Sequence, residues 1–256
     1  MALMTDGNPN GTEELRVYEA SILSVSHMEE IDLDAKLGLA TEEVSQEVLD
    51  MLLGHDPAAV GLDGGRRTIG VSDVVVTPQV KRWHALHTLS VVYRDVYHNQ
   101  LNDRYRMKWE EYRTLSREAR EQAMRFGIGL VTTPIPRAGL PSFSVVAGLI
   151  AATTYYVRVS WVGANGQEGA GSFPTTYLTV DGSRLVVTPP SAPTVATAWN
   201  VYIGLTYDSL ILQNAAPIST GVSFTLPAGG LVVGRAPGGG QAPDMYVTGG
   251  RLLRRG

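Results

Sequence analysis

Residues 103–130, DRYRMKWEEYRTLSREAREQAMRFGIGL, contain the point at which the pattern of apolar residues changes. Up to Phe126 the apolar side chains recur every three or four residues, which predicts an amphipathic helix. Gly127 then predicts the end of that helix, because glycine adopts backbone conformations that other residues avoid. Beyond Leu130 the period becomes two residues, as in a β-strand. The sequence therefore predicts a helical first half and a β-structured second half.

Two more helices are expected before this stretch. One follows Ile31, where the apolar residues have helical spacing. They are Leu33, Leu37, Ala40, Val44, Val48 and Met51. The other starts at Thr77-Pro78, because threonine can cap the first turn and proline lacks an N–H that would be unpaired there.

The helix that begins at Pro78 has apolar residues on two faces. Trp83, Leu86, Tyr93 and Tyr97 form one stripe, and Leu89, Val92 and Val96 form the other. A helix of this kind is buried on two sides, either within its own subunit or against a neighbouring copy. If a neighbouring copy covers one face, the stripe that contains Trp83 and Tyr97 is a candidate contact between subunits.

The second half of the chain predicts several short strands. Residues 154–162, TYYVRVSWV, alternate between two faces, and the Asn165-Gly166 pair after them is a hairpin signal. Further strands are expected at residues 177–180, 185–188, 199–203, 210–213 and 222–226, with a second hairpin signal at Asp181-Gly182. This spacing favours a β-sandwich of about seven strands. Tyr156 and Arg158, on the outward face of the first strand, are candidate surface contacts.

Charge is distributed unevenly along the chain. Residues 1–129 contain 21 acidic and 14 basic side chains, a net charge of −7, whereas residues 130–256 contain 4 and 7, a net charge of +3. This change favours a domain boundary near residue 130 and an α+β fold with several domains. We predict a flexible tail at 1–11, a helical domain at 12–129, a β-sandwich domain at 130–235, and a linker with an extended C-terminal arm at 236–256.

The composition also excludes some kinds of site and partner. The chain has no cysteine, which excludes disulfides, thiolate metal sites and cysteine nucleophiles. The formal net charge of −4 implies no polyanionic partner. Residues 1–11 are polar, and no run reaches the roughly 18 apolar residues of a membrane span. We therefore expect a protein made in the cytoplasm, without a membrane partner.

No group of residues predicts catalysis. His84 and His87 are three residues apart on a helix, but no third metal ligand accompanies them, so core or interface roles are favoured. The acidic cluster in residues 29–34 lacks the spacing of a calcium loop and is more typical of a solvated helix start. We therefore predict a protein that is not an enzyme and that uses no cofactor or metal.

Two arginine-containing segments are candidates for contact with other proteins. Residues 61–70, GLDGGRRTIG, form a glycine-rich loop with Arg66 and Arg67, and they lack the ending of a phosphate-binding loop. The chain end carries Arg251, Arg254 and Arg255. A basic terminal segment can dock on a partner protein by adding a strand or by running along its surface.

Five stretches, in two groups, resemble known phage proteins. LRVYEASILSVSHMEEIDLDAKLGLATEEVSQEVLDMLL (15–53) and WHALHTLSVVYRDVYHNQLNDRYRMKWEEYRTLSREA (83–119) resemble the head–tail adaptors of tailed bacteriophages, the connector class that docks below the portal ring. TYYVRVSWVGANGQEGAGS (154–172), with WNVYIG (199–204) and PISTGVSFTLPAGGL (217–231), resembles the fibronectin type III or immunoglobulin-like modules inserted in phage structural proteins.

The resemblance implies a structural subunit of the virion neck, without catalysis or cofactor. Its copies would form a ring, commonly a dodecamer, that binds the portal protein and a tail or nozzle protein. Genomic DNA would pass through the lumen without sequence recognition. The terminal arginines would dock on a neighbouring subunit or the portal, and the β domain would lie outside the neck as decoration or as a binder of surface glycans.

Two other interpretations remain open. A receptor- or glycan-binding tail protein with a helical anchor would bind its ligand through residues 134–235, and binding by those residues alone would favour it. An enzyme with an accessory module is the second alternative. The sequence offers no catalytic constellation for it.

Overall fold

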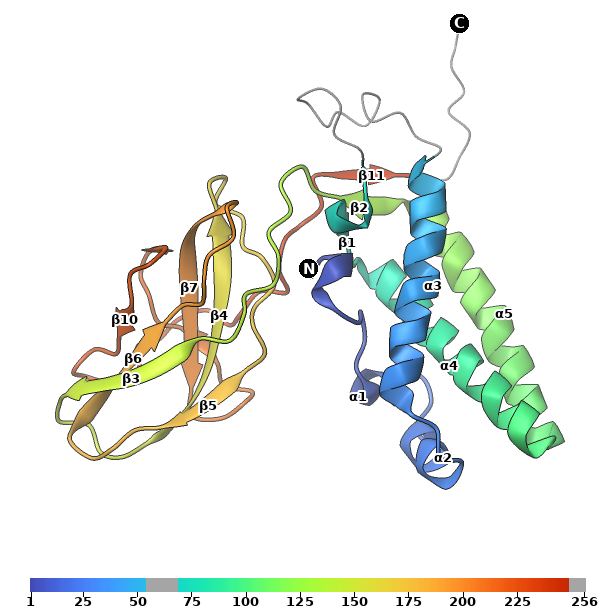
Figure 1. Ribbon diagram of the computed structural model, residues 1–256, viewed down its shortest axis with the longest axis horizontal. Helices are drawn as coiled ribbons and strands as arrows, with labels where there is room; N and C mark the ends of the chain where they lie inside the picture. Colours follow the sequence, from blue (N-terminus) through green and yellow to red (C-terminus); the bar gives the residue numbers. More distant parts are fainter. Residues whose placement is uncertain (54–68, 249–256) are drawn as a thin grey trace, which may run out of the picture. The chain divides into compact units, whose positions relative to one another are not determined.

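The computed structural model describes residues 1–53 and 69–248 of the 256-residue chain. The fold is mixed α+β: the long helices lie in one part of the chain with a small antiparallel sheet, and the larger antiparallel sheets lie in another (Figure 1). Arg66 and Arg67 of the glycine-rich loop, and Arg251, Arg254 and Arg255 of the chain end, lie outside the described residues.

The chain divides into two compact units, each built from separate stretches of sequence. Met1–Asp6 and Thr133–Ala242 form one, here called the β unit; Gly7–Thr132 and Pro243–Gly256 form the other, here called the helical unit. The main part of the β unit, Thr133–Ala242, is therefore an insertion in the helical unit. The chain passes between the two units after Asp6, after Thr132 and after Ala242.

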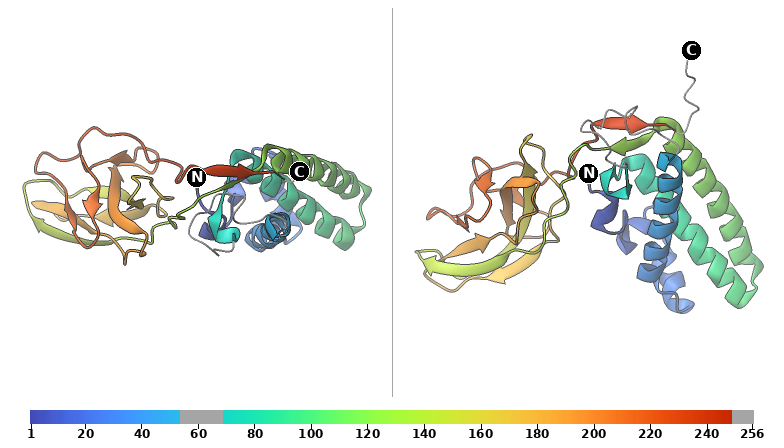
Figure 2. Two further views of the ribbon diagram at one scale, coloured as in Figure 1. Left: turned by 90° about the horizontal axis from the view of Figure 1, so that it is seen from above. Right: turned by 45° about the horizontal axis from the view of Figure 1, so that its top comes forward.

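Three long helices form most of the described part of the helical unit. They are α3 (Leu33–Leu53), α4 (Pro78–Gln100) and α5 (Asp103–Phe126). Two short helices, α1 (Thr12–Leu15) and α2 (Ile22–Met28), precede them, and a 3-10 turn at Val71–Asp73 comes before α4. α4 and α5 lie side by side as an antiparallel hairpin, as both views in Figure 2 show.

The predicted start of α4 at Thr77 and the predicted end of α5 at Gly127 are confirmed, and Asn102 caps the start of α5. Thr77 Oγ1 accepts a hydrogen bond from the Val80 N–H (3.4 Å), and Asn102 Oδ1 accepts one from the Arg104 N–H (3.0 Å). Gly127, with a φ of 98°, follows the last residue of α5. These caps supply partners for main-chain groups that have none within the helix.

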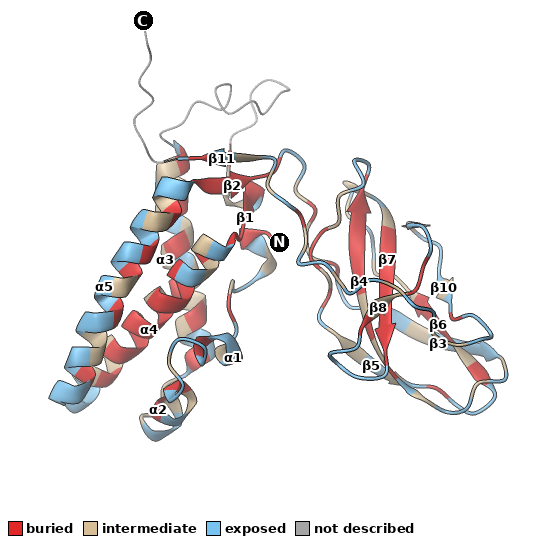
Figure 3. Cartoon of the chain, turned by 180° about the vertical axis from the view of Figure 1, so that it is seen from behind, coloured by how far each residue is buried: buried red, intermediate tan, exposed pale blue. Residues whose placement is uncertain are grey.

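α4 is the centre of the helical core, and its buried side chains lie on most of its circumference (Figure 3). They are Val80, Trp83, His84, Ala85, Leu86, Thr88, Leu89, Ser90, Val91, Val92, Tyr93 and Val96. α3 and α5 both pack against it. On α5 the buried Ala119 and Ala123 have small side chains that allow the two helices of the hairpin to approach closely.

A small antiparallel sheet completes the helical unit. It contains β1 (Val74–Val75), β2 (Ile128–Leu130) and β11 (Met245–Val247), in the order β1–β2–β11. A Cβ at Gly129 would lie 2.7 Å from Pro243 Cγ, so only glycine allows this approach of the chain. Part of the segment predicted as an extended arm is thus a strand of the helical unit.

The β unit consists of two antiparallel sheets. Its strands are β3 (Ser142–Ala147), β4 (Thr154–Gly163), β5 (Thr175–Leu178), β6 (Ser183–Thr188), β7 (Ala196–Gly204), β8 (Ile211–Leu212), β9 (Ile218–Ser219) and β10 (Phe224–Thr225). One sheet has the order β10–β6–β3; the other has the order β5–β4–β7–β8, with β9 also paired to β7.

Both sheets contribute to one apolar core. Val157, Val159 and Trp161 of β4 lie in it, and alternation along the strand places their neighbours on the opposite face. β6 adds Leu185 and Val187 from the second sheet. The hydrophobic alternation of residues 154–162 thus predicts the inward face of β4 correctly.

The two predicted turns form, but one of them is not a hairpin. Gly166 and Gly182 have φ values of 76° and 70°, the left-handed region that glycine tolerates. β5 and β6, on either side of Asp181-Gly182, belong to different sheets. The turn therefore takes the chain from one sheet to the other, which corrects the hairpin prediction there.

The N-terminal residues make specific contacts where the sequence predicts a flexible tail at 1–11. The Met1 ammonium group donates to the Gln241 carbonyl oxygen (2.8 Å), and Asp6 Oδ1 accepts from the Arg137 N–H (2.7 Å). The short, polar composition that suggests a tail also supplies side chains that bind main-chain groups.

Candidate assembly surface

The apolar stripe predicted as a contact between subunits lies mainly inside a single copy. Trp83, Leu86 and Tyr93 are 1%, 3% and 2% exposed. Tyr93 stacks on Tyr112 of α5, with ring centroids 5.5 Å apart. The chain's own helices therefore cover both faces of α4, which corrects the prediction that a neighbouring copy covers one of them.

Tyr97 has a different environment from the rest of the stripe. It is partly buried and stacks on Trp109 of α5, with ring centroids 6.0 Å apart. The Arg113 guanidinium lies over the Trp109 ring, 6.0 Å from its centroid. Next to this pair in sequence, Leu101 and Met107 are 74% and 66% exposed. The closed end of the α4–α5 hairpin thus keeps apolar surface uncovered.

His84 is part of a buried polar network between α4, α3 and the segment before α1. Asn10 Nδ2 donates to His84 Nδ1 (2.9 Å), so Nδ1 is unprotonated and Nε2 carries the proton. Nε2 lies 2.9 Å from Thr41 Oγ1 and 3.3 Å from the Leu37 carbonyl oxygen. Burial lowers the pKa of His84 to about 4 and outweighs the Leu37 hydrogen bond. This histidine is a neutral structural residue.

His87 points to a separate partner. Its Nε2 lies 2.5 Å from Glu43 Oε2 of α3, and its Nδ1 lies 3.4 Å from Ser116 Oγ of α5. It therefore connects the three long helices. Within residues 1–53 and 69–248 no cluster of three or more histidine and carboxylate side chains is arranged to hold a metal ion.

Glu19 connects the segment between α1 and α2 to α5. It accepts hydrogen bonds from Tyr112 Oη (2.9 Å) and Ser21 Oγ (2.7 Å) and forms an ion pair with Lys108 Nζ (2.9 Å). Burial alone would raise the pKa of Glu19, but these donors lower it to about 2. The contact is a stabilising one, because the charged carboxylate has three donors.

Two acidic residues near Ile31 accept hydrogen bonds, and one of them lies at the start of α3. Asp32 Oδ1 accepts from the Ala35 N–H at the first turn of α3 (3.0 Å), and Glu29 Oε1 accepts from Tyr105 Oη (2.7 Å). A carboxylate at this position also interacts favourably with the positive end of the helix dipole.

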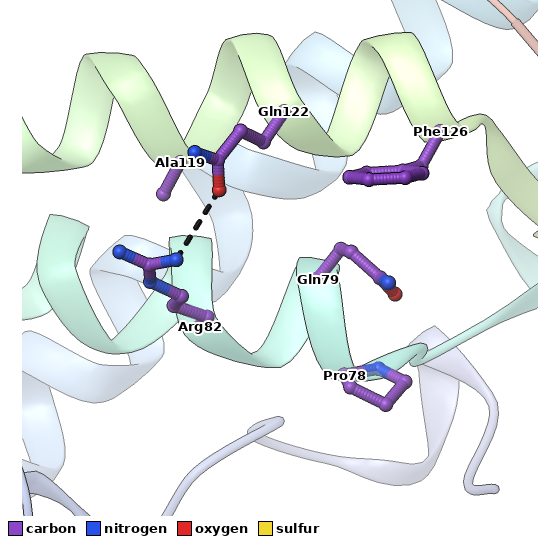
Figure 4. Close-up of a pocket in the computed structure, with 6 residues that line it drawn as sticks. All are labelled: Pro78, Gln79, Arg82, Ala119, Gln122 and Phe126. Atoms are coloured by element: carbon purple, nitrogen blue, oxygen red, sulfur yellow. Dashed lines mark hydrogen bonds between the residues drawn. The ribbon is translucent and has the colours of Figure 1, made fainter.

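An open groove lies between the start of α4 and the end of α5 (Figure 4). Its volume is about 260 Å³, and it is lined by Pro78, Gln79, Arg82, Ala119, Gln122 and Phe126. Arg82 Nη1 donates to Gln122 Oε1 across it (3.2 Å). Phe126 is 64% exposed at its edge. A large aromatic side chain beside a hydrogen-bonding pair is typical of a protein contact surface.

The sequence does not predict this groove. Phe126 continues the apolar spacing of α5, so periodicity assigns it to the core. The signal against that assignment is its position as the last residue of the helix, directly before Gly127. There α5 ends, and the aromatic ring lies at the edge of the groove opposite the first turn of α4, 64% exposed (Figure 4).

Tyr156 and Arg158 lie on β4 as the sequence predicts, and both are partly buried. Arg158 is packed tightly, since a Cβ at Gly171 would lie 2.6 Å from Arg158 Cδ. They are therefore less accessible than freely exposed contact residues.

No protein-family model matches the chain, and no curated protein matches its sequence. Among the described helices, none is both long enough and apolar enough to cross a bilayer.

Proposed function

We propose that this protein is a non-catalytic structural subunit of the neck of a tailed-bacteriophage virion. Its helical unit assembles into a ring, commonly a dodecamer, that docks on the portal and joins the head to a tail or nozzle protein. The β unit is an immunoglobulin-like or fibronectin type III sandwich on the outside of that ring.

The groove beside Phe126 is the observation that carries the proposal. It combines an aromatic side chain that is 64% exposed with the Arg82–Gln122 hydrogen bond, on the rigid α4–α5 hairpin. Exposed aromatic residues in such surroundings often provide much of the binding energy of an interface. This contact replaces the stripe of α4 as the proposed surface for a neighbouring subunit.

Two further features support the proposal. Both stretches that resemble phage adaptors fall in the helical unit and supply its long helices. The net charge of −7 in residues 1–129 suits the wall of a channel through which DNA must pass without binding.

A substitution of Phe126 tests the proposal. Phe126→Ser is expected to lower the fraction of protein in rings by about tenfold or more, measured by native mass spectrometry with and without the portal protein. Met107→Ser is the matched control, because its side chain is 66% exposed on the same helix and does not line the groove. A wild-type protein that stays monomeric and ignores the portal would refute the ring itself.

A receptor- or glycan-binding tail protein is the second candidate. It is favoured by one observation: the β unit has its own core, and nearly all of it, Thr133–Ala242, is inserted in the helical unit as one stretch. Binding of the full-length protein to host cells, without rings and without portal binding, would select this alternative.

A further inference from the structure

Two arginines of the β unit lie together without a carboxylate partner. Arg158 is on β4, and Arg137 is in the segment before β3. Burial lowers the pKa of the Arg158 guanidinium, the Tyr207 side chain offsets part of this, and the charge of Arg137 lowers it again. Two neighbouring positive charges therefore repel each other in a partly buried site, which is unfavourable unless an anion lies between them.

The Nε atoms of both arginines are buried and unpaired. Neither Arg137 Nε nor Arg158 Nε has a hydrogen-bond partner among the described residues. A buried donor without an acceptor destabilises the folded state, and more so when it belongs to a charged group. Gly171 leaves space for the Arg158 side chain, because a Cβ at residue 171 would collide with it.

Elsewhere the same unit pairs one arginine with a carboxylate. Arg235 Nη2 lies 2.5 Å from Glu168 Oε2, and that carboxylate also accepts from Tyr202 Oη (2.5 Å). The Asp6 carboxylate accepts from the main-chain N–H groups of Leu3 and Arg137, and no ion pair joins it to the Arg137 guanidinium among the described residues. The Arg137–Arg158 pair thus lacks the counter-ion that Arg235 has.

Two exposed aromatic side chains accompany the pair. The Arg137 guanidinium lies over the ring of Phe173, 4.6 Å from its centroid. Phe173 is 63% exposed, and Tyr207, which interacts electrostatically with Arg158, is 58% exposed. Aromatic rings with this exposure can stack on the apolar face of a sugar, while a guanidinium binds carboxylate or sulfate through paired N–H groups.

We propose that Arg137 and Arg158 bind one carboxylate or sulfate group of an acidic polysaccharide, with Phe173 and Tyr207 contacting the adjacent sugar rings. The proposal does not depend on the neck assignment. Nucleic acid fits less well, because residues 133–242 contain only four arginines and no lysine, too few for a track along a phosphate backbone.

Titration of the full-length protein with three hexamers tests the site: oligogalacturonate, neutral maltohexaose and a hexathymidylate. Saturable binding of oligogalacturonate alone, weakened by salt, is the expected result. Arg137→Gln and Arg158→Gln should each weaken it by about tenfold or more. Arg184→Gln is the control. Arg184 is on β6 and donates to the Ala147 carbonyl oxygen (3.4 Å), so its substitution should change the affinity for oligogalacturonate less than about twofold.

Thermal unfolding separates a binding role from a structural one. If Arg158 is kept for an anion, Arg158→Gln should unfold at the same temperature as the wild type or higher in anion-poor buffer, because a repelling charge is removed. Oligogalacturonate should raise the unfolding temperature of the wild type only. Lower stability of Arg158→Gln, equal binding by the variants, or equally tight binding of hexathymidylate would each overturn the proposal.

Discussion

His84 makes the stability of the helical unit depend on pH. Its pKa is about 4 in the folded chain and about 6.5 when it is exposed, so between these values the unfolded chain binds more protons. The free energy of unfolding should therefore fall as the pH drops from 6.5 to 4, by up to roughly 3 kcal/mol. Protonated Nδ1 would also face the amide donor of Asn10.

Chemical denaturation at several pH values, with NMR titration of the His84 ring, measures this effect. His84→Gln should have a flatter profile in the same range. A ring that titrates near pH 6.5 in the folded protein would contradict the prediction, whatever the stability of the variant.

Leu101 stores strain at the end of α4. Its φ of 50° lies in the left-handed region, where a side chain other than glycine costs about 1 kcal/mol. Leu101→Gly should raise the free energy of unfolding by roughly 0.5–1 kcal/mol. Met107→Gly, in the interior of α5, should lower it by about the same amount. Urea denaturation compares the two, and a loss of stability in both would show that the strain is not released.

At individual positions the sequence predicts burial better than it predicts the partner. The spacing of Trp83, Leu86 and Tyr93 correctly places them in apolar surroundings. It does not say whether α3 and α5 of the same copy or helices of another copy provide those surroundings. The Arg137–Arg158 pair cannot be predicted from the sequence either. The two residues are 21 positions apart and come together only when the β unit folds.

β11 is the element whose role differs most from the expected arm. Val247 pairs with Ile128 and is 6% exposed, and the Asp244 N–H donates to the Leu130 carbonyl oxygen (2.8 Å). Removing residues 244–256 should therefore lower the unfolding temperature of the helical unit, because the β2 edge loses its partner. An assembly defect of this truncation would then follow from the destabilised helical unit, and it would not test whether the chain end docks on a partner.

A shorter truncation separates the two effects. Removing only residues 249–256 keeps β11 and deletes Arg251, Arg254 and Arg255. Its unfolding temperature should match the wild type, and weaker ring formation or portal binding would then show that the terminal arginines act in docking. Unchanged assembly would exclude that role.

The elements themselves were predictable where local chemistry decides them. Thr77, Asn102 and Gly127 mark helix ends through contacts with neighbours a few residues away. The pairing of β2 with β11 and the change of sheet at Gly182 depend on residues far apart in the chain. Periodicity contains no information on such pairings, so those two features could not be predicted.

For the whole molecule, the insertion of the β unit predicts that the helical unit folds without it. Thr132 and Asp244 are joined by a hydrogen bond (2.8 Å), so a short turn can replace residues 133–242. This variant, also lacking residues 1–6, should keep its helical circular dichroism and unfold in a single transition. Loss of the helical signal would show that the two units fold as one.

The course of the chain also determines how the molecule responds to proteases. Because the polypeptide crosses between the units after Asp6, Thr132 and Ala242, one cut at a crossing leaves the two units linked by the peptide chain at the other crossings. The contacts of Met1 and Asp6 add a further, non-covalent link to the stretch Thr133–Ala242. A nicked particle would therefore keep its β units attached, and shedding them would require cleavage at more than one crossing.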